Sequence, residues 1–133
     1  MGVIQEKMAN LDASWNKAGN KYCVGSSSGN VYVGRYYADN NFWVAHAITK
    51  KPIHKASVVC VRFDCSGRAV ASASLDGSVS IISSYHEDLD QGSTEGPFGN
   101  VASFGDTLLS ISSATWINGL AFSPNSKLLA YVT

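Results

Sequence analysis

Residues His54 to Gly77, HKASVVCVRFDCSGRAVASASLDG, carry the pattern that decides the fold of this 133-residue chain. Two runs of small and β-branched residues, VVCVRF (58–63) and AVASAS (69–74), are separated by DCSGR, which is rich in turn-forming residues. A second turn, LDG (75–77), leads into a third run, SVSIISS (78–84). The pattern predicts three short strands joined by tight turns.

The same pattern occurs earlier in the chain and begins again near its end. WNKAGNKYCVGSSSGNVYVGRYY (15–37) aligns without a gap with FDCSGRAVASASLDGSVSIISSY (63–85), with an aromatic residue first and glycines at the same turn positions. A third copy starts at Phe122 with FSPNSKLLAYVT. Internal copies of this kind are the signature of a repeat architecture. We therefore expect a first repeat at 1–50, a second at 51–112 and a truncated third at 113–133.

The predicted strands are apolar on both faces, so each sheet must be covered on both sides, as happens when similar sheets stack around a ring. The aromatic positions Trp15, Phe63 and Phe122 recur at intervals near the roughly 40–45 residues of one WD40 blade. The longer second interval contains HEDLDQGSTEGPFGN (86–100), an acidic run rich in Gly and Ser. That composition predicts a surface insertion before the outer strand of the second blade.

The expected fold class is therefore all-β: a WD40-type β-propeller, here a fragment of about two to three four-stranded blades of an expected seven. A propeller ring needs at least about four blades, so the faces at both ends of such a fragment would expose hydrophobic surface. Isolated repeats commonly need neighbours to be stable. We expect the chain to self-associate or to adopt a compact arrangement that is not a ring.

His54, Ser74 and Asp76 lie close in sequence and allow two interpretations, a catalytic triad or a structural network. Their spacing resembles the WD40 repeat, in which a buried histidine donates to a turn aspartate and a serine joins them. A catalytic interpretation would need an exposed nucleophile and an oxyanion donor set, and the sequence has no G-x-S-x-G elbow. The first copy has Ser28 in place of Asp76, and Glu6 in place of His54. The spacing favours the structural interpretation.

The chain has a formal net charge of zero, from 10 Lys and Arg against 10 Asp and Glu, so no overall charge attracts nucleic acid. Its apolar runs are far shorter than the roughly 18 residues of a membrane span, and we expect none. The three cysteines, Cys23, Cys60 and Cys65, show no CxxC spacing and are expected to be reduced, as apolar filler or a surface thiol. His46 and His86 lack spaced partners, so no metal site is expected.

Four further motifs carry a closer resemblance, which covers nearly the whole chain. In order they are DNNFWV (39–44), KKPI (50–53), PFG (97–99) and FSPNSKLLAYV, which follows a Trp-containing strand. Together they resemble the WD40-repeat subunit, subunit 1 of the p40/p41 type, of the actin-related protein 2/3 complex. The Trp-Asp pair that names the repeat is absent here, because Ile82 and Ser83 stand in its place in one copy.

The resemblance implies a scaffold with no catalytic activity, because nucleotide binding and hydrolysis belong to the actin-related subunits of that complex. It implies no cofactor. The implied partners are the other subunits, actin filaments and nucleation-promoting factors, and the implied location is the cytoplasmic actin cytoskeleton. The alternative from the same blade pattern is a WD40 adaptor of a different multiprotein assembly. A third possibility is an enzyme that uses the His54, Ser74 and Asp76 set.

One stretch, NNFWVAHAITKKPIHK (40–55), combines aromatic residues with lysines on a predicted outer strand and the following loop. An outer strand packed on its own blade explains this composition, since lysines discourage pairing at a sheet edge. A contact with another subunit also explains it, because aromatic anchors with cationic neighbours are common at interfaces. The candidate partner surface therefore consists of Phe42, Trp43, Lys50, Lys51 and Lys55.

Overall fold

The computed structural model describes residues 9–90 and 92–133, and within these ranges every regular element is a β-strand. No helical segment in this described part has the length and apolar character of a membrane span. Residues 1–8 of the expected first repeat, including Glu6, lie outside the described residues. The strands are β1 (Asn10–Trp15), β2 (Lys21–Ser26), β3 (Val31–Tyr37), β4 (Phe42–Ala47), β5 (Val58–Phe63), β6 (Ala69–Ser74), β7 (Ser78–Ser83), β8 (Glu95–Gly96), β9 (Gly99–Asn100), β10 (Thr107–Ser112), β11 (Gly119–Phe122) and β12 (Leu129–Val132).

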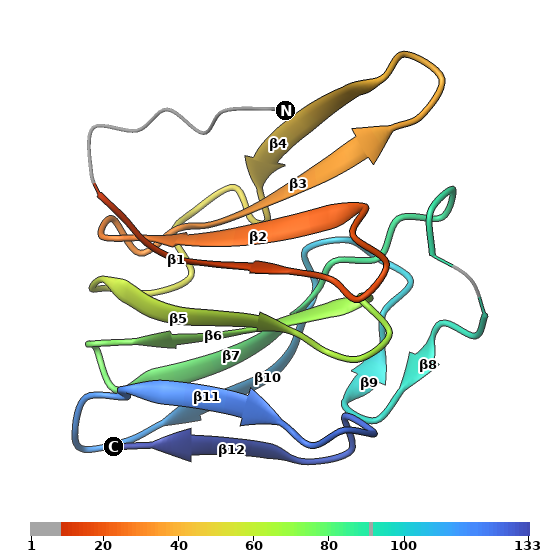
Figure 1. Ribbon diagram of the computed structural model, residues 1–133. Coiled ribbons are helices and arrows are strands. Elements are labelled where there is room, and N and C mark those ends of the chain that lie inside the picture. The colour runs from red at the N-terminus through yellow and green to blue at the C-terminus, as the bar shows by residue number, and fades with distance from the viewer. Residues whose placement is uncertain (1–8, 91) are drawn as a thin grey trace.

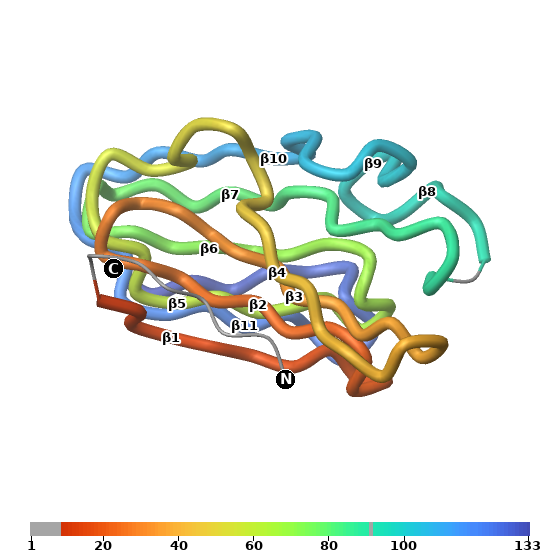
Figure 2. Tube along the Cα trace, turned by 90° about the horizontal axis from the view of Figure 1, so that it is seen from above, coloured from red at the N-terminus to blue at the C-terminus, as the bar shows by residue number. Residues whose placement is uncertain are grey.

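The strands form antiparallel sheets that are stacked face to face (Figure 1). The first blade has the order β1-β2-β3-β4, the second blade β5-β6-β7-β10, and the third blade contains β11 and β12. β1, β5 and β11 run along the same side of the stack, as the two perpendicular views agree (Figure 1, Figure 2). This stack of antiparallel sheets is the all-β, blade-by-blade arrangement predicted from the repeats.

Strands β6 and β7 of the second blade are buried on both faces because their side chains alternate between two apolar clusters. On β6, Val70 belongs to the cluster shared with the first blade, whereas Ala69, Ala71 and Ala73 belong to the cluster shared with the third. Successive side chains of a strand point to opposite faces, so this alternation gives each face its own core. All six residues of the run AVASAS (69–74) are buried, so neither face of β6 meets water.

The first cluster joins Cys23, Val31 and Val33 of the first blade to Val58, Val61, Phe63, Val70 and Ile82 of the second. The second cluster joins the opposite face of the second blade to the third blade. It includes Leu120, which lies on β11, and Ile117, which precedes that strand. Burying a Val or Ile side chain is worth roughly 1.5–3 kcal/mol. Packing between blades therefore stabilises the stack.

Glycine turns connect each blade to the loop that enters the next one. Gly29 has φ +89° and Gly77 has φ +85°, a region that residues with a Cβ rarely adopt. A Cβ on Gly29 would lie 2.2 Å from the carbonyl oxygen of His54, and one on Gly77 would lie 2.7 Å from that of Ser113. The His54 amide donates to the Gly29 carbonyl, and the Ser113 amide donates to that of Gly77. The absence of a side chain thus permits the same backbone contact at both blade junctions.

The insertion between β7 and β10 folds back on the first blade. The fully buried Lys21 ammonium donates to the Ser84 carbonyl and to Asp90 Oδ2, both at 2.8 Å. Burial lowers the pKa of Lys21, and the ion pair with Asp90 opposes that shift. Arg35 pairs with Asp88 at 2.6 Å and stacks on the Tyr37 ring. The acidic run thus contains a buried partner for a lysine of the neighbouring blade, as well as exposed charge.

His86 sits in this insertion beside the same ion pair. Its backbone amide donates to Asp90 Oδ2 at 2.7 Å, and its ring Nδ1 donates to the Ser84 carbonyl at 3.0 Å. Its ring also packs against Phe104, with 5.0 Å between the centroids. Burial, with the nearby charges of Lys21 and Arg35, lowers the pKa of His86 to about 4. The imidazole is therefore neutral at neutral pH.

The turn geometry predicts that Gly29→Ala destabilises the fold more than Gly19→Ala. Both residues have positive φ, so each alanine suffers a backbone strain of roughly 1–2 kcal/mol. Only Gly29 faces a neighbouring backbone, since nothing lies within 4 Å of a Cβ built on Gly19. Thermal unfolding followed by circular dichroism measures both losses. Equal melting temperatures for the two variants would contradict the proposed blade contact.

Candidate functional site: the His54 network and the loop edge

The His54 imidazole lies buried between two serine hydroxyls of the second blade. Its Nδ1 is 2.7 Å from Ser78 Oγ, and its Nε2 is 2.8 Å from Ser72 Oγ. His54 precedes β5, Ser72 lies on β6 and Ser78 begins β7, so the ring crosslinks the strands of one sheet. Burial lowers the pKa of His54, and the Asp76 charge opposes that shift without reversing it. The ring is thus neutral at neutral pH and has one donor and one acceptor nitrogen.

Asp76 completes the network from the turn between β6 and β7. Its Oδ1 accepts bonds from the backbone amide and the hydroxyl of Ser78, and its Oδ2 accepts a bond from the Lys55 amide. Although burial raises the pKa of Asp76, these hydrogen bonds outweigh it and hold the pKa below the usual value. Because the Ser78 hydroxyl donates to the carboxylate, it must accept from His54 Nδ1–H, which leaves Nε2 to accept from Ser72.

The direct bond from the imidazole to the aspartate that we expected is replaced by a contact through Ser78. His54 Nδ1 lies 3.6 Å from Asp76 Oδ2, which is too long for a hydrogen bond. The expected serine, Ser74, sits beside the turn: its hydroxyl donates to the Ala56 carbonyl and accepts from the Asp76 amide. The structure thus brings His54 and Asp76 together, whereas Ser74, at the end of β6, bonds to the backbone of the neighbouring loop.

Ser72 and Ser78 are the two network residues that the sequence reasoning did not name. Ser72 could have been found from strand periodicity, because it lies two residues before Ser74 and points to the same face. Ser78 follows the turn glycine directly, a position from which its hydroxyl reaches back to Asp76. Ser72, Ser74 and His54 are all buried, so their polar atoms bond to each other and to the backbone.

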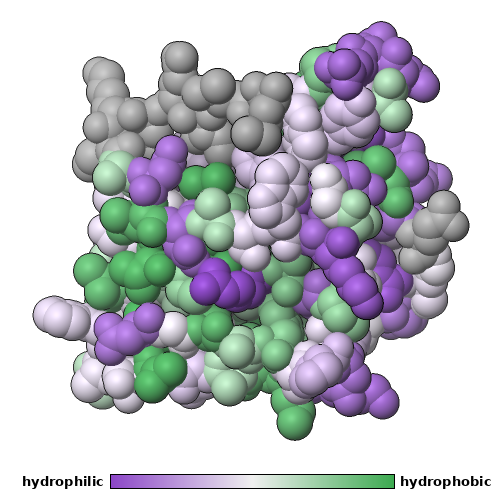
Figure 3. All heavy atoms as spheres, in the orientation of Figure 1, coloured by the Kyte–Doolittle hydropathy of each residue, from purple (hydrophilic) through white to green (hydrophobic). Residues whose placement is uncertain are grey.

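The five residues of the candidate partner surface occupy two separate regions. Phe42 and Trp43 begin β4, and because they are adjacent in a strand they point to opposite faces. Phe42 stacks on Tyr37 with 5.3 Å between the ring centroids, and Trp43 packs against the rings of Trp15, Tyr22 and Tyr36. The β3–β4 hairpin tip, which is hydrophilic in Figure 3, lies at this end of β4.

Lys50, Lys51 and Lys55 lie beyond the other end of β4, in the loop that leads to β5, and all are exposed. The same edge of the stack carries the β2–β3, β6–β7 and β10–β11 connections, on the left in Figure 1. We call it the loop edge. The backbone of Lys55 is fixed by its bond to Asp76, so the buried network positions a lysine on this edge.

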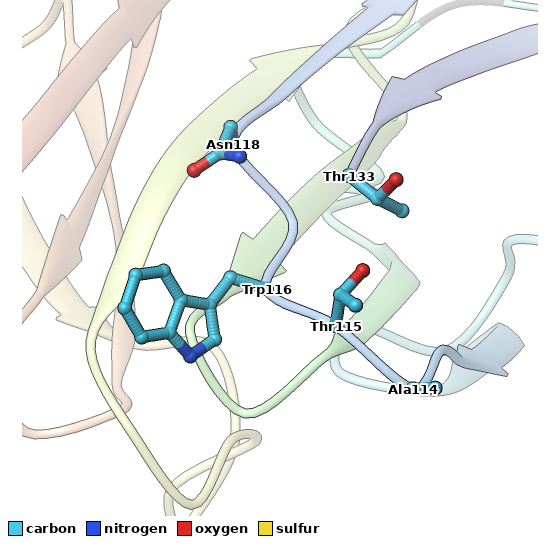
Figure 4. A pocket seen from close by; sticks show the side chains of 5 residues that line it. All are labelled: Ala114, Thr115, Trp116, Asn118 and Thr133. Carbon is cyan, nitrogen blue, oxygen red and sulfur yellow. The ribbon is translucent and has the colours of Figure 1, made fainter.

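A shallow hollow of about 430 Å³ opens on the loop edge at the third blade. Its lining consists of Ala114, Thr115, Trp116, Asn118 and Thr133. Figure 4 shows the Trp116 indole on one side of the 114–118 segment and the Thr115 and Thr133 side chains on the other. None of these five side chains ionises, so the hollow has no side-chain group for acid–base chemistry.

The cysteines and histidines form no metal-binding group in the part of the chain that the structure describes. Cys23 and Cys60 are buried, one in each apolar cluster, whereas Cys65 is exposed. Burial raises the pKa of the Cys23 and Cys60 thiols. Both are therefore neutral and act as small apolar side chains.

Comparison with known proteins places a repeat over the second blade. Residues 47–83 match the family described as WD domain, G-beta repeat, a range that includes His54, both network serines, Asp76 and β5 to β7. Two solved structures share the fold, each with a TM-score of 0.66: a chain of the mitotic checkpoint complex (16% identical) and the Cps50 (Swd1) β-propeller domain of Myceliophteria thermophila (13%). This chain is covered to 96% in both and covers 32% and 33% of them.

The sequence is similar to subunit 1 of the actin-related protein 2/3 complex along nearly its whole length. Subunit 1A of Arabidopsis thaliana is 29% identical over 131 residues, which is 98% of this chain and 34% of that protein. Subunit 1 of Saccharomyces cerevisiae is 29% identical over 132 residues, with the same two coverages. The chain spans about a third of the length of these relatives. The resemblance identified from the sequence motifs is thereby confirmed.

The network geometry predicts that Ser72→Ala lowers the free energy of unfolding by roughly 1–3 kcal/mol, because it leaves His54 Nε2 buried without a partner. Chemical denaturation measures this loss, and Ser110→Ala, at an exposed site on β10, is the control. A catalytic role would instead give a normally stable Ser72→Ala or Ser74→Ala protein that lacks an activity. Wild-type stability of Ser72→Ala would contradict the structural role.

Two histidines, the buried His54 and the half-buried His86, predict a loss of stability in mild acid. Both have pKa values below the ordinary 6.5, and the unfolded chain therefore binds more protons as the pH falls. The melting temperature should decrease from about pH 6.5 towards pH 4.5. His86→Gln should make this decrease shallower, whereas His46→Gln, which removes an exposed histidine, should not. An equally steep decrease in His86→Gln and the wild type would contradict the lowered pKa of His86.

Fold, repeat and relatives agree on one description of this chain. Its blades stack as propeller blades do, and its second blade carries the matched repeat. The buried network of His54, Ser72, Ser78 and Asp76 lies within the matched range. The chain therefore has the fold of WD40-type propeller blades, residues 47–83 match the WD repeat, and the sequence is similar throughout to subunit 1 of the actin-related protein 2/3 complex.

Proposed function

We propose that this chain is a non-catalytic scaffold in a complex of the actin-related protein 2/3 type and supports nucleation and branching of actin filaments. Its proposed partners are the other subunits, actin filaments and nucleation-promoting factors, and its proposed location is the cytoplasmic actin cytoskeleton. The observation that carries the proposal is the similarity to subunit 1 over 98% of the chain. No cofactor is part of it.

The extent of the similarity supports this assignment over a generic propeller. A blade requires apolar strands, turn glycines and a polar network, and these features are common to WD40 repeats of unrelated function. The motif DNNFWV lies instead in the β3–β4 hairpin, and KKPI lies on the loop edge. Several residues of both motifs are exposed to solvent. Residues that the fold does not demand are the ones that carry information about partners.

A scaffold role without catalysis is supported by the chemistry of the network. The hydroxyls of Ser72 and Ser74 are buried and already bonded, so neither is available as a nucleophile. The His54 ring is held between two serines and has no free nitrogen to accept a proton from a substrate. These contacts stabilise the blade and position the loop edge.

The alternative function is that of a WD40 adaptor in a different multiprotein assembly. It is supported by the fold likeness to a chain of the mitotic checkpoint complex and to the Cps50 propeller, at 16% and 13% identity. That likeness concerns the fold alone. The two functions differ in the proteins that would be recovered with the chain.

Affinity purification of the tagged protein from its native cells, followed by mass spectrometry, tests the proposal. We expect two actin-related proteins and a small set of stoichiometric companions. Recovery of an unrelated assembly would overturn the proposal and support the adaptor alternative.

A matched pair of variants tests whether the loop edge contributes to those contacts. Lys50→Glu/Lys51→Glu should reduce the recovery of the actin-related proteins, since both lysines are exposed on the loop edge. Lys127→Glu, an exposed lysine in the β11–β12 turn at the opposite edge, is the control. Undiminished recovery with the double variant would exclude the two lysines from the interface.

A further inference from the structure

The backbone around Lys55 is held by both blades that meet at this point of the loop edge. The Lys55 amide donates to Asp76 Oδ2 at 2.8 Å, and the preceding amide, of His54, donates to the Gly29 carbonyl of the first blade at 3.2 Å. The carbonyl groups of the two following residues accept hydrogen bonds from the end of β6 and from the turn after it. These bonds run from the Ser74 hydroxyl to Ala56, at 3.1 Å, and from the Leu75 amide to Ser57, at 3.0 Å. The segment 54–57 is therefore fixed relative to two blades.

Lys50 and Lys51 lie earlier in the same loop and are held differently. Among the described residues, the one hydrogen bond to their backbone groups is donated by the Thr49 hydroxyl to the Lys51 carbonyl. This bond lies within the loop and connects it to neither blade. A partner that contacts Lys55 thus meets a backbone that is already ordered, whereas contact with Lys50 or Lys51 has to order one.

The loop edge also carries positive charge that its own residues do not balance. In the part of the chain that the structure describes, the three lysines of this edge take part in no ion pair. Asp76 is the carboxylate of this edge, and both of its oxygens already accept hydrogen bonds from Ser78 and the Lys55 amide. The exposed carboxylates lie in the β3–β4 hairpin tip, in the insertion and before β10: Asp39, Glu87, Asp88, Glu95 and Asp106. An acidic group is therefore attracted to the loop edge although the chain has a formal net charge of zero.

We propose that Lys55 fixes the position of an acidic partner protein on the loop edge, its ammonium binding a carboxylate of the partner, and that Asp76 is the positioning residue for this lysine. The inference rests on the proposed function, because the partner is taken to be a protein of that complex. A charge-assisted hydrogen bond depends on where both groups lie, and a fixed backbone limits where the Lys55 ammonium can be. Lys50 and Lys51 add to the field that attracts the partner.

The arrangement favours a protein over an anionic membrane as the occupant of this edge. Segments that bind anionic lipids typically contain about 4–8 lysines and arginines, and each charge near the surface contributes a similar amount. The loop edge has only Lys50, Lys51 and Lys55. A lipid surface would respond to their number, whereas a partner carboxylate in a defined place responds to which of them is fixed.

A matched pair of neutralising variants tests the proposal in the affinity purification of the tagged protein. Lys55→Gln and Lys50→Gln each remove one exposed charge from the same loop, so neither should disturb folding. We expect Lys55→Gln to reduce the recovery of the actin-related proteins about tenfold. Lys50→Gln should reduce it by no more than about twofold. Equal losses in the two variants would show that only the total charge matters, and would overturn the proposal.

A double-variant cycle tests the role of Asp76. Asp76→Ala removes the acceptor of the Lys55 amide and should also lower recovery. The combined variant Asp76→Ala/Lys55→Gln should lose no more than Lys55→Gln alone, because both changes act through one side chain. Losses that multiply would assign Asp76 a structural role only and overturn the positioning. Circular dichroism checks that Asp76→Ala folds, and the lysine pair decides the role of Lys55 without it.

The remaining outcomes distinguish this inference from the proposed function. Absence of actin-related proteins from the wild-type purification would overturn both. Undiminished recovery of these proteins with Lys55→Gln would overturn this inference alone. Sedimentation of the purified chain with phosphatidylserine vesicles, reduced equally by Lys50→Gln and Lys55→Gln, would assign the edge to an anionic membrane and would overturn it as well.

Discussion

The burial of β6 and β7, in the second blade, on both of their faces is the constraint on which the rest of the structure depends. A sheet with two apolar faces cannot exist alone in water, so its formation requires a sheet on either side. The first blade and the third blade meet this requirement through separate clusters. The glycine turns, the buried serines and the insertion all serve contacts between these sheets or within the covered one.

Polar groups in this stack are tolerated because each has a defined partner. His54 lies between Ser72 and Ser78, and Lys21 lies between a carbonyl and a carboxylate. Both groups are neutralised or paired where water cannot reach them, and each links segments that are distant in sequence. The His54 network stabilises one blade from within, whereas the Lys21 pair joins the insertion to a different blade. Together they restrict how the blades can be arranged around the apolar clusters.

Local patterns were enough to predict the strands of the second blade. The runs 58–63 and 69–74 coincide with β5 and β6, because alternating small and β-branched residues bounded by turn glycines define a strand from within its own sequence. The contact of Lys21 with Asp90 could not be predicted in this way, because it joins positions 69 residues apart and depends on how the insertion folds back. For the same reason the acidic run was expected to be a simple surface segment.

The candidate sites show a similar division. The spacing of His54 and Asp76 in the sequence was enough to predict that they lie close together. His54 is in the loop before β5 and Asp76 is in the β6–β7 turn, and these two loops meet at one edge of the sheet. The partner serines depend on which face of β6 points to the ring, and so Ser72 and Ser78 emerged only from the geometry. Phe42 and Trp43 are neighbours in sequence but lie on opposite faces of β4, and the lysines lie at its far end. The candidate partner surface was inferred from a continuous stretch of sequence. Its residues do not form one surface, because successive side chains of a strand point to opposite faces.

Native-state amide hydrogen exchange tests the central claim, that the doubly covered second blade stabilises the stack. Exchange is slowest where opening requires global unfolding, and faster where a segment opens locally. The account predicts the slowest exchange in β6 and β7, which have neighbours on both faces, and faster exchange in β11 and β12. Exchange in β6 and β7 that is as fast as in β12 would contradict it.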